Sequence, residues 1–339
     1  MRKLKTFFRR MRTMSLKRMT MYAKKAACES KKPVFLILAD MTLCTVKYGV
    51  GYLDYLTFGF VHQNAAARKT YMTMNDNLRI AQRLNAPNKK ELFENKLRFA
   101  ELFSNYLHRD FLDLTVSDIG QFSAFAKAHR VFFAKEPNNY GGLGVSRISV
   151  EDDTDTAALR KELIEKGQLL VEAAVVQHEG MNMLNRSSVN TIRLVTLFAQ
   201  GKPQVMYSLV RMGGGDSFVD NISSGGMYAP LDHDGNITAP AFCDKTGEYY
   251  ETHPATGTAL VGYRLPYFEE AISLVLEAAH VVKEVRYVGW DVAISETGPV
   301  IIEGNTLPSY DMCQNYRHLG IDKVGIKPRF KQVLGDDFD

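Results

Sequence analysis

The spacing of apolar residues changes character near residue 118. Before that point the chain favours helices, and the clearest amphipathic stretch runs from Asn88 to Leu107. After it, strand-length apolar runs at 131–135, 145–148, 168–172, 191–198 and 204–211 alternate with predicted helices at 119–128, 156–166 and 267–285. The alternation lacks a regular βαβ cadence, so the pattern predicts an α+β fold preceded by a mostly helical N-terminal region.

A predicted β-hairpin near the C-terminal end carries polar side chains in apolar strands. Residues 289–294 and 301–305 flank a turn-forming segment at 295–299. Side chains alternate along a strand, so Glu303 and Asn305 share a face, while Asp291 places a second carboxylate in the partner strand. Buried carboxylates need a cation or a base, and oxygen ligands of this kind suit Mg²⁺ beside phosphates. The alternative is an edge hairpin whose polar residues face water.

Composition narrows the class of protein. The 339 residues are 45% hydrophobic, which is enough for two or three packed lobes, and no apolar run reaches the ~20 residues that span a bilayer. The most apolar segment, 43–61, contains Lys47 and Asp54 and favours a buried helix pair. The four cysteines lack metal or disulfide spacing, which is typical of a reducing, cytoplasmic compartment.

Positive charge is concentrated in the first residues. Positions 2–25 carry ten lysines and arginines and no acidic residue. The net charge of the whole chain is only +4, so the remainder of the chain is net acidic. Apolar residues interleave with these charges, which predicts a basic amphipathic helix over residues 1–28 on an anionic membrane, at its inner face. A solvated terminus is the alternative. We expect no nucleic-acid partner, because no recognised nucleic-acid module is present.

A lysine followed by clustered glycines indicates an anion site. Lys135 ends a predicted strand, and Gly141, Gly142 and Gly144 follow it. Glycines let backbone N–H groups approach an anion closely, and the lysine adds a point charge. The spacing matches neither a Walker loop nor a Rossmann fingerprint. An exposed glycine-rich hairpin is the alternative.

Two arginines and a second polar loop also indicate an anion site. Arg193 lies in an apolar strand and needs a buried acid or a bound anion as partner. Arg211 precedes a glycine-rich loop with potential donors at Asn221, Ser223 and Ser224. Each arginine alone fits a structural ion pair; together with the lysine and the hairpin they predict a magnesium–nucleotide site beside an anionic substrate.

In this order the residues resemble the ATP-grasp superfamily. Asn95–Lys96 opens a helix, Lys135 precedes the glycine loop, Glu172 ends a strand, and Glu303 and Asn305 follow Asp291 by about a dozen residues. More narrowly, segments 188–193, 221–226, 253–257 and 288–293 resemble the sugar-transfer-associated ATP-grasp family, which is related to alpha-L-glutamate ligases. The resemblance covers residues 75–312 and implies two α+β lobes that grip ATP.

The resemblance implies roles for individual residues. Lys96 and Lys135 would bind the ATP phosphates under a lid formed by Gly141, Gly142 and Gly144. Adenine would be bound by Glu172, Ala173, Ala174 and Val175. Ribose would be bound by His178, Glu179 or Asn190. Mg²⁺ would be held by Asp291, Glu303 and Asn305. The acceptor carboxylate would be received by Arg193, Arg211, Asn221, Ser223 and Ser224, with His253 or Asp220 as a base.

The expected organisation and function follow from this resemblance. We predict a basic arm (1–30), a mostly helical region (31–118), a central lid subdomain (119–185), a C-terminal subdomain with the metal site (186–320) and a tail (321–339). The implied activity is an ATP- and Mg²⁺-dependent carboxylate–amine ligase that forms an acyl phosphate. Its partners would be small-molecule or glycoconjugate carboxylates and amines in cell-envelope polysaccharide assembly. An ATP-grasp kinase acting on a sugar or polyol, and a non-catalytic nucleotide-binding scaffold, are the alternatives.

Overall fold

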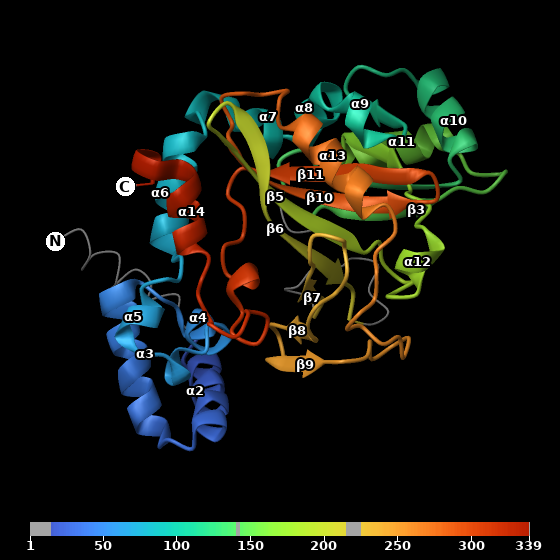
Figure 1. The fold of residues 1–339 in the computed structure, drawn as a ribbon. Helices are drawn as coiled ribbons and strands as arrows, with labels where there is room; N and C mark the ends of the chain where they lie inside the picture. The colour runs from blue at the N-terminus through green and yellow to red at the C-terminus, as the bar shows by residue number, and fades with distance from the viewer. Residues whose placement is uncertain (1–14, 140–142, 215–224, 339) are drawn as a thin grey trace. The chain divides into compact units, whose positions relative to one another are not determined.

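The computed structural model describes residues 15–139, 143–214 and 225–338 and confirms an α+β fold (Figure 1). The chain divides into two compact units. Unit 1 contains the residues up to Ile80 together with the segment from Ser309 onward, and unit 2 is Ala81–Pro308. In the described part of the chain, no helix is long and apolar enough to cross a membrane.

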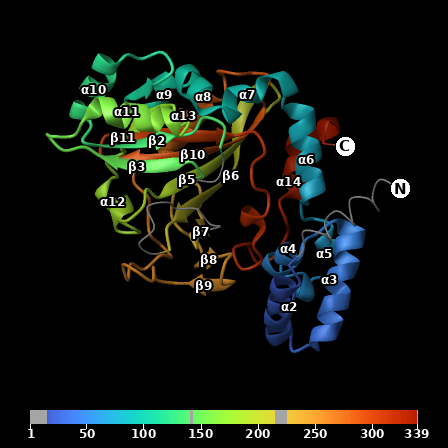
Figure 2. The ribbon, with the colours of Figure 1, turned by 180° about the vertical axis from the view of Figure 1, so that it is seen from behind.

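Unit 1 is built from helices. Its elements are α2 (Leu16–Ser30), α3 (Val34–Tyr48), α4 (Tyr52–Thr57), η1 (Phe60–His62), α5 (Ala65–Arg68), most of α6 (Met74–Leu84), η4 (Met312–Gln314), α14 (Lys327–Leu334) and η5 (Gly335–Asp337). Ser15 caps α2 by accepting a hydrogen bond from the backbone N–H of Arg18 at 3.3 Å. The turn Lys31–Pro33 then joins α2 to α3, and these two helices lie side by side in both views (Figures 1 and 2).

The C-terminal segment is an integral part of unit 1. The Gln314 side chain accepts from the backbone N–H of Met72 at 2.7 Å and donates to the Met72 carbonyl at 3.1 Å. The Tyr310 hydroxyl donates to Asp54 at 2.7 Å. The predicted tail 321–339 is therefore wrong as a tail, because it contains α14 and packs within this unit. The predicted helical region 31–118 is likewise divided between the two units.

Unit 2 contains two antiparallel sheets. The smaller has the strand order β1-β4-β2-β3. The larger has the order β11-β10-β5-β6-β7-β8-β9, and its strands are labelled in Figure 2. The strands are β1 (Phe111–Asp113), β2 (Val131–Lys135), β3 (Val145–Ser149), β4 (Leu170–Ala173), β5 (Thr191–Ala199), β6 (Lys202–Met212), β7 (Met227–Pro230), β8 (Ala241–Cys243), β9 (Glu248–Tyr250), β10 (Tyr287–Ser295) and β11 (Gly298–Asn305). The helices are η2 (Pro87–Lys89), α7 (Glu91–Glu94), α8 (Lys96–Leu102), α9 (Ser104–Leu107), α10 (Ile119–Ala128), α11 (Thr156–Glu165), α12 (Glu179–Asn182) and α13 (Phe268–Ala278).

The predicted hairpin is confirmed as β10 and β11, and the predicted helix 119–128 is confirmed as α10. The continuous helix predicted for 88–107 is wrong. Asn95 adopts an extended conformation, and its side chain accepts from the N–H groups of Leu97 and Arg98, so a new helix, α8, begins there. The helix predicted for 267–285 is shorter and ends at Ala278.

The break at Asn95 lets α7 and α8 pack on the hairpin. Trp290 of β10 is fully buried, lies against the rings of Phe93 and Phe103, and donates from its indole N–H to Thr196 at 2.8 Å. Gly304 of β11 makes the close approach feasible, because a Cβ atom there would lie 2.9 Å from Phe93. The apolar contact therefore fixes the start of α8 beside the metal-binding candidates of β11.

Candidate functional site

A cavity of about 280 Å³ lies in unit 2 and brings together five residues predicted from the sequence. These are Lys96 of α8, Lys135 of β2, Glu172 of β4, and Glu303 and Asn305 of β11. Apolar walls are supplied by Phe93, Phe99, Leu170, Ile302 and Leu307. Glu94, Asn139 and Thr306 also line the cavity. Two cationic and three carboxylate side chains thus face one space that apolar side chains help to enclose, as is typical of a ligand site.

Glu172 is a buried carboxylate between two cations. Strand pairing puts Phe111 of β1 and Phe133 of β2 opposite it, so the segments before β1 and after Phe133 flank its side chain. Arg109 binds one carboxylate oxygen at 2.6 Å, and Lys135 pairs with the other. Burial alone would raise the pKa of Glu172, but the two cations outweigh burial and hold the pKa at about 2.

Arg109 was not predicted from the sequence. Besides Glu172, its guanidinium donates to the carbonyl of Ile301 at 2.6 Å, so it joins β4 to β11 across the cavity wall. No local motif marks this arginine. The available signal was indirect: a glutamate inside an apolar strand requires buried cations, and Lys135 alone leaves one oxygen unmatched.

Lys96 ties the start of α8 to the segment that follows β2. Its ammonium donates to the carbonyls of Glu136 and Asn139, and its backbone N–H donates to Pro137 at 2.9 Å. Burial, together with the nearby charge of Lys135, lowers the pKa of Lys96, although neighbouring glutamates oppose the shift. Two ammonium groups that face the same cavity can both contact a polyanion such as a triphosphate.

The predicted glycine lid is described only at its end. Gly144 has φ +69°, and a Cβ atom there would lie 2.5 Å from the Glu136 carboxylate, so this position requires glycine. Gly141 and Gly142 lie outside the described residues, as do the acceptor candidates Asn221, Ser223 and Ser224 and the base candidate Asp220. Their roles stay predictions.

Three charged residues form a row across adjacent strands. Pairing aligns Arg193 of β5 with Asp291 of β10, and Asp291 with Glu303 of β11. Arg193 binds both Asp291 oxygens, at 2.5 and 3.0 Å, and Arg211 of β6 adds a contact at 2.8 Å. Asp291 is buried, which would raise its pKa, but the two arginines hold the pKa well below its ordinary value. Both arginines therefore bind a protein carboxylate, which is one of the two kinds of partner expected for Arg193.

Glu303 lies between this ion-pair cluster and the cavity. Its carboxyl group lies beside that of Asp291 on the adjacent strand, and it accepts from the Asn305 amide at 3.3 Å. Burial and the adjacent Asp291 charge both raise the pKa of Glu303. A carboxylate placed against another carboxylate gains from a cation, and oxygen donors of this type suit Mg²⁺.

The metal prediction needs one refinement. Both Asp291 oxygens are engaged by arginines, so Glu303 and Asn305 are the predicted ligands that face the cavity. Among the described residues, no group of three or more His, Cys, Asp or Glu side chains could hold a metal by itself. Phosphate oxygens of a bound nucleotide would therefore have to complete the coordination shell, as is usual for Mg²⁺.

The proposed base role of His253 is not supported. The side chain is fully buried; its Nε2 contacts the carbonyl of Gly213 at 2.8 Å, and its Nδ1 accepts from the N–H of Ala255 at 3.3 Å. Burial lowers the pKa of His253, which favours the neutral ring. Both ring nitrogens are used by the backbone, so this histidine holds a loop together.

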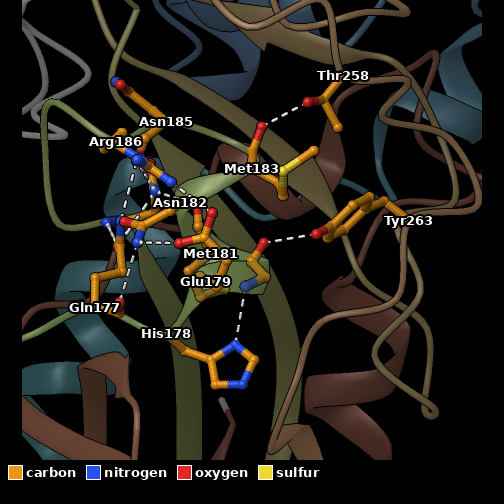
Figure 3. Close-up of polar contacts among 12 residues, drawn as sticks. Gln177, His178, Glu179, Met181, Asn182, Met183, Asn185, Arg186, Thr258 and Tyr263 are labelled. Carbon is orange, nitrogen blue, oxygen red and sulfur yellow. Dashed lines mark hydrogen bonds and ion pairs between the residues drawn. The ribbon is translucent and has the colours of Figure 1, made fainter.

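Two of the three ribose candidates, His178 and Glu179, lie at the start of α12 (Figure 3). His178 caps this helix, with Nδ1 accepting from the N–H of Gly180 at 2.9 Å. The buried Asn190 amide donates to the carbonyls of Met181 and Asn185 at 2.9 and 2.7 Å. Gln177, the residue before His178, donates to the carbonyl of Asn185 and accepts from the N–H of Asn190. These amide contacts fix the segment that leads into β5. None of the three candidates, His178, Glu179 and Asn190, lines the cavity found in the described residues.

The adenine candidates follow the buried strand β4. The N–H of Ala173 donates to the backbone carbonyl of Asp110 at 2.9 Å, and that of Ala174 donates to the carbonyl of Val131 at 3.4 Å. Val175 is partly exposed just beyond. The Glu172 carboxylate is directed at cations, so contact with an adenine amino group would have to come from the backbone of this segment. The hinge role remains a prediction.

A model of the family described as sugar-transfer associated ATP-grasp matches residues 75–327 of the chain. The match covers all of β1–β11, and therefore every candidate described above. A comparison with curated proteins found no match.

Solved structures with a similar arrangement include D-alanyl-alanine synthetase A from Vibrio cholerae O1 biovar eltor, at 13% identity and TM-score 0.43, with 75% of this chain and 68% of that chain covered. N5-carboxyaminoimidazole synthetase from Staphylococcus aureus, complexed with ADP, shows 12% identity and TM-score 0.44, with 72% and 52% covered. The ATP-grasp ligase PsnB, complexed with a minimal precursor, Mg and ADP, shows 11% identity and TM-score 0.43, with 76% and 62% covered. The chain thus spans half to two thirds of their length. At this degree of similarity they carry no information on substrate.

Proposed function

Because the chain belongs to the sugar-transfer associated ATP-grasp family, we propose that unit 2 is an ATP- and Mg²⁺-dependent ligase that joins a carboxylate to an amine. The observation that supports this most is the cavity, which gathers Lys96, Lys135, Glu172, Glu303 and Asn305 from four separate segments. Two lysines suit the phosphates of ATP, and the oxygen donors opposite them suit a divalent cation.

Mg²⁺ fits the residues present. Glu303 is buried against the charge of Asp291, and a divalent ion would neutralise that repulsion. Glu303 and Asn305 would hold the ion together with phosphate oxygens. When bound, it would neutralise the charge that develops on the transferred phosphoryl group.

The residues of this chain mainly position the reactants. Lys96 is fixed by backbone carbonyls and Lys135 by Glu172, so both ammonium groups are oriented before ATP binds. The acceptor carboxylate oxygen attacks the γ-phosphorus, the bond to the β-phosphate oxygen breaks, and ADP leaves. The amine nitrogen then attacks the carbonyl carbon of the acyl phosphate, and phosphate leaves as the nitrogen loses a proton.

We propose acceptors in cell-envelope polysaccharide or glycoconjugate assembly, and this rests on the description of the family alone. Arg193 and Arg211 already bind Asp291. If they also bind an acceptor carboxylate, they do so in addition to this ion pair. A cytoplasmic location is supported by the four free cysteines, Cys28, Cys44, Cys243 and Cys313.

Nucleotide binding tests the site before the acceptor is known. Lys135→Ala should weaken Mg·ADP binding in calorimetry about tenfold or more, because a buried charge-assisted contact to phosphate is lost. Lys161→Ala is the matched control, since Lys161 is exposed on α11 and pairs with Glu165 of the same helix. Equal binding by wild type and both variants would contradict a phosphate role for this cavity.

Product analysis tests the reaction class. Incubation with ATP, Mg²⁺ and candidate carboxylates and amines should give ADP, free phosphate and an amide in equal amounts. ADP with a phosphorylated acceptor and no free phosphate would identify a kinase instead. Nucleotide binding without turnover of any acceptor would favour the scaffold.

A further inference from the structure

Helix α3 of unit 1 exposes an apolar stripe along its outer side. Ile37, Met41 and Cys44 are buried at helical spacing. On the opposite side Phe35 is 69% exposed, Leu36 50%, Leu43 58% and Val46 66%. The stripe extends about 17 Å along the helix axis, at 1.5 Å per residue. Contiguous exposed apolar side chains of this size mark an interaction surface.

The outer side of α3 contains no acid. The one acidic residue of the helix, Asp40, is turned inward, where it binds Arg68 at 2.6 Å and accepts from the Tyr55 hydroxyl at 2.7 Å. The helix ends regularly at Gly49, which has φ 74° and donates to the carbonyl of Thr45. The apolar stripe is therefore a property of a well-formed helix.

Basic residues border the stripe. Lys31 and Lys32 are exposed just before α3, and Lys47 is exposed at its end. On the adjacent helix α2, Lys17 and Lys24 are exposed as well. The acid of that helix, Glu29, is bound to Arg317 at 3.1 Å. An apolar strip with a lysine border is complementary to a surface that is apolar below and anionic above.

We propose that α3 lies in the plane of an anionic phospholipid membrane, with its apolar stripe among the acyl chains and the bordering lysines at the headgroups. In-plane helices combine these two features. A second copy of the chain fits less well, because a two-fold contact would set the same lysines against each other.

This assignment shifts the membrane contact predicted for residues 1–28. The apolar side of α2, with Tyr22, Ala23, Ala26 and Ala27, is buried inside unit 1 and is not available to lipid. Residues 1–14 lie outside the described part of the chain. The proposal concerns unit 1 and is independent of the activity proposed for unit 2.

Vesicle flotation with the full chain tests the proposal. We expect binding to vesicles of phosphatidylcholine with about 30% phosphatidylserine, and weaker binding to phosphatidylcholine alone. The double variant Phe35→Ser/Leu43→Ser should lower the partition coefficient about tenfold or more, because two inserted apolar side chains are lost. Raising the salt from about 0.1 M to about 0.5 M should weaken binding of the wild type.

Two controls keep the result specific. Ile321→Ser removes a fully exposed apolar side chain of unit 1 that does not belong to α3 and should leave binding unchanged. Phe35→Trp keeps an interfacial aromatic ring and should retain binding. The proposal is overturned if the double variant binds like the wild type, or if only removal of residues 2–14 abolishes binding. It is also overturned if the double variant merely changes a self-association equilibrium while neither protein binds vesicles.

Discussion

The Glu172 ion-pair triad permits a quantitative prediction for the substitution Glu172→Gln. In the folded protein the pKa of Glu172 falls from 4.5 to about 2, because Arg109 and Lys135 overcome the effect of burial. One pKa unit corresponds to about 1.4 kcal/mol, so the ionised carboxylate contributes about 3 kcal/mol to the free energy of unfolding at pH 7. The amide has no charge and leaves two buried cations unmatched, so we expect a loss of about this size.

The sign of the pH dependence follows from the lowered pKa. The contribution is present above pH 4.5 and is lost as the pH falls toward 2, where the carboxylate is protonated in both states. The difference between wild type and variant should therefore shrink to about half by a pH of ~3.

Urea unfolding followed by tryptophan fluorescence measures this difference in unit 2 directly. Trp290 is the only tryptophan of the chain and is fully buried in unit 2. Glu162→Gln is the control, because Glu162 is 55% exposed on α11 and pairs with Lys166 at the surface. We expect that change to stay within about 0.5 kcal/mol. A loss below about 1 kcal/mol for Glu172→Gln at pH 7, or one that does not change with pH, would refute the reasoning.

Three further predictions concern the same unit. His253→Asn should reduce the loss of unfolding free energy that the wild type shows below pH 6.5. Burial lowers the pKa of His253, so the neutral ring stabilises the fold above that pH and the stabilisation is lost as the pH falls. The same pH profile for wild type and variant in urea unfolding would contradict a buried neutral ring. Asn85→Ala should cost about 2–4 kcal/mol in urea unfolding, because this fully buried amide bonds both backbone groups of Tyr287; a cost near zero would mean that water replaces it. Glu303→Gln should weaken ADP binding about tenfold in the presence of Mg²⁺ and much less with EDTA, whereas the exposed turn variant Glu296→Gln should match the wild type; equal losses with and without metal would exclude a metal role.

Local sequence was sufficient to predict the hairpin and its polar residues. The alternation of β10 and β11 is short-range, and a turn-forming segment joins them, so Asp291 and Glu303 could be placed in adjacent strands without knowledge of the rest of the chain. The pairing of these two residues is seen only in the structure. The partner of Arg193 could be narrowed only to a buried acid or an anion. The order of strands in the sheet shows that the partner is Asp291, because β10 lies beside β5 although about a hundred residues separate them.

The errors have local and non-local causes. The apolar stripe of 88–107 favours one helix, but the Asn95 side chain competes for the N–H groups of the next turn and starts a new helix. Arg109 could not be assigned because it lies 63 residues from Glu172, and only the β1–β4 pairing brings the two together. His253 resembled a base in sequence; its burial and its backbone contacts are visible only in three dimensions.

The bond pair between Gln314 and Met72 has a consequence for biosynthesis. A ribosome makes Met72 first and then all of unit 2, roughly 230 residues that take about 10–45 s at cellular elongation rates, before it reaches Gln314. Throughout that interval the backbone of Met72 has no glutamine to bond, and the nearby rings of Phe58 and Tyr71 lack the C-terminal segment that belongs to their unit. Unit 2 can complete its sheets during translation, whereas the earliest helices must wait for the latest residues. Stalled or truncated chains should therefore display unit 1, rather than the nucleotide site, as the surface that chaperones capture.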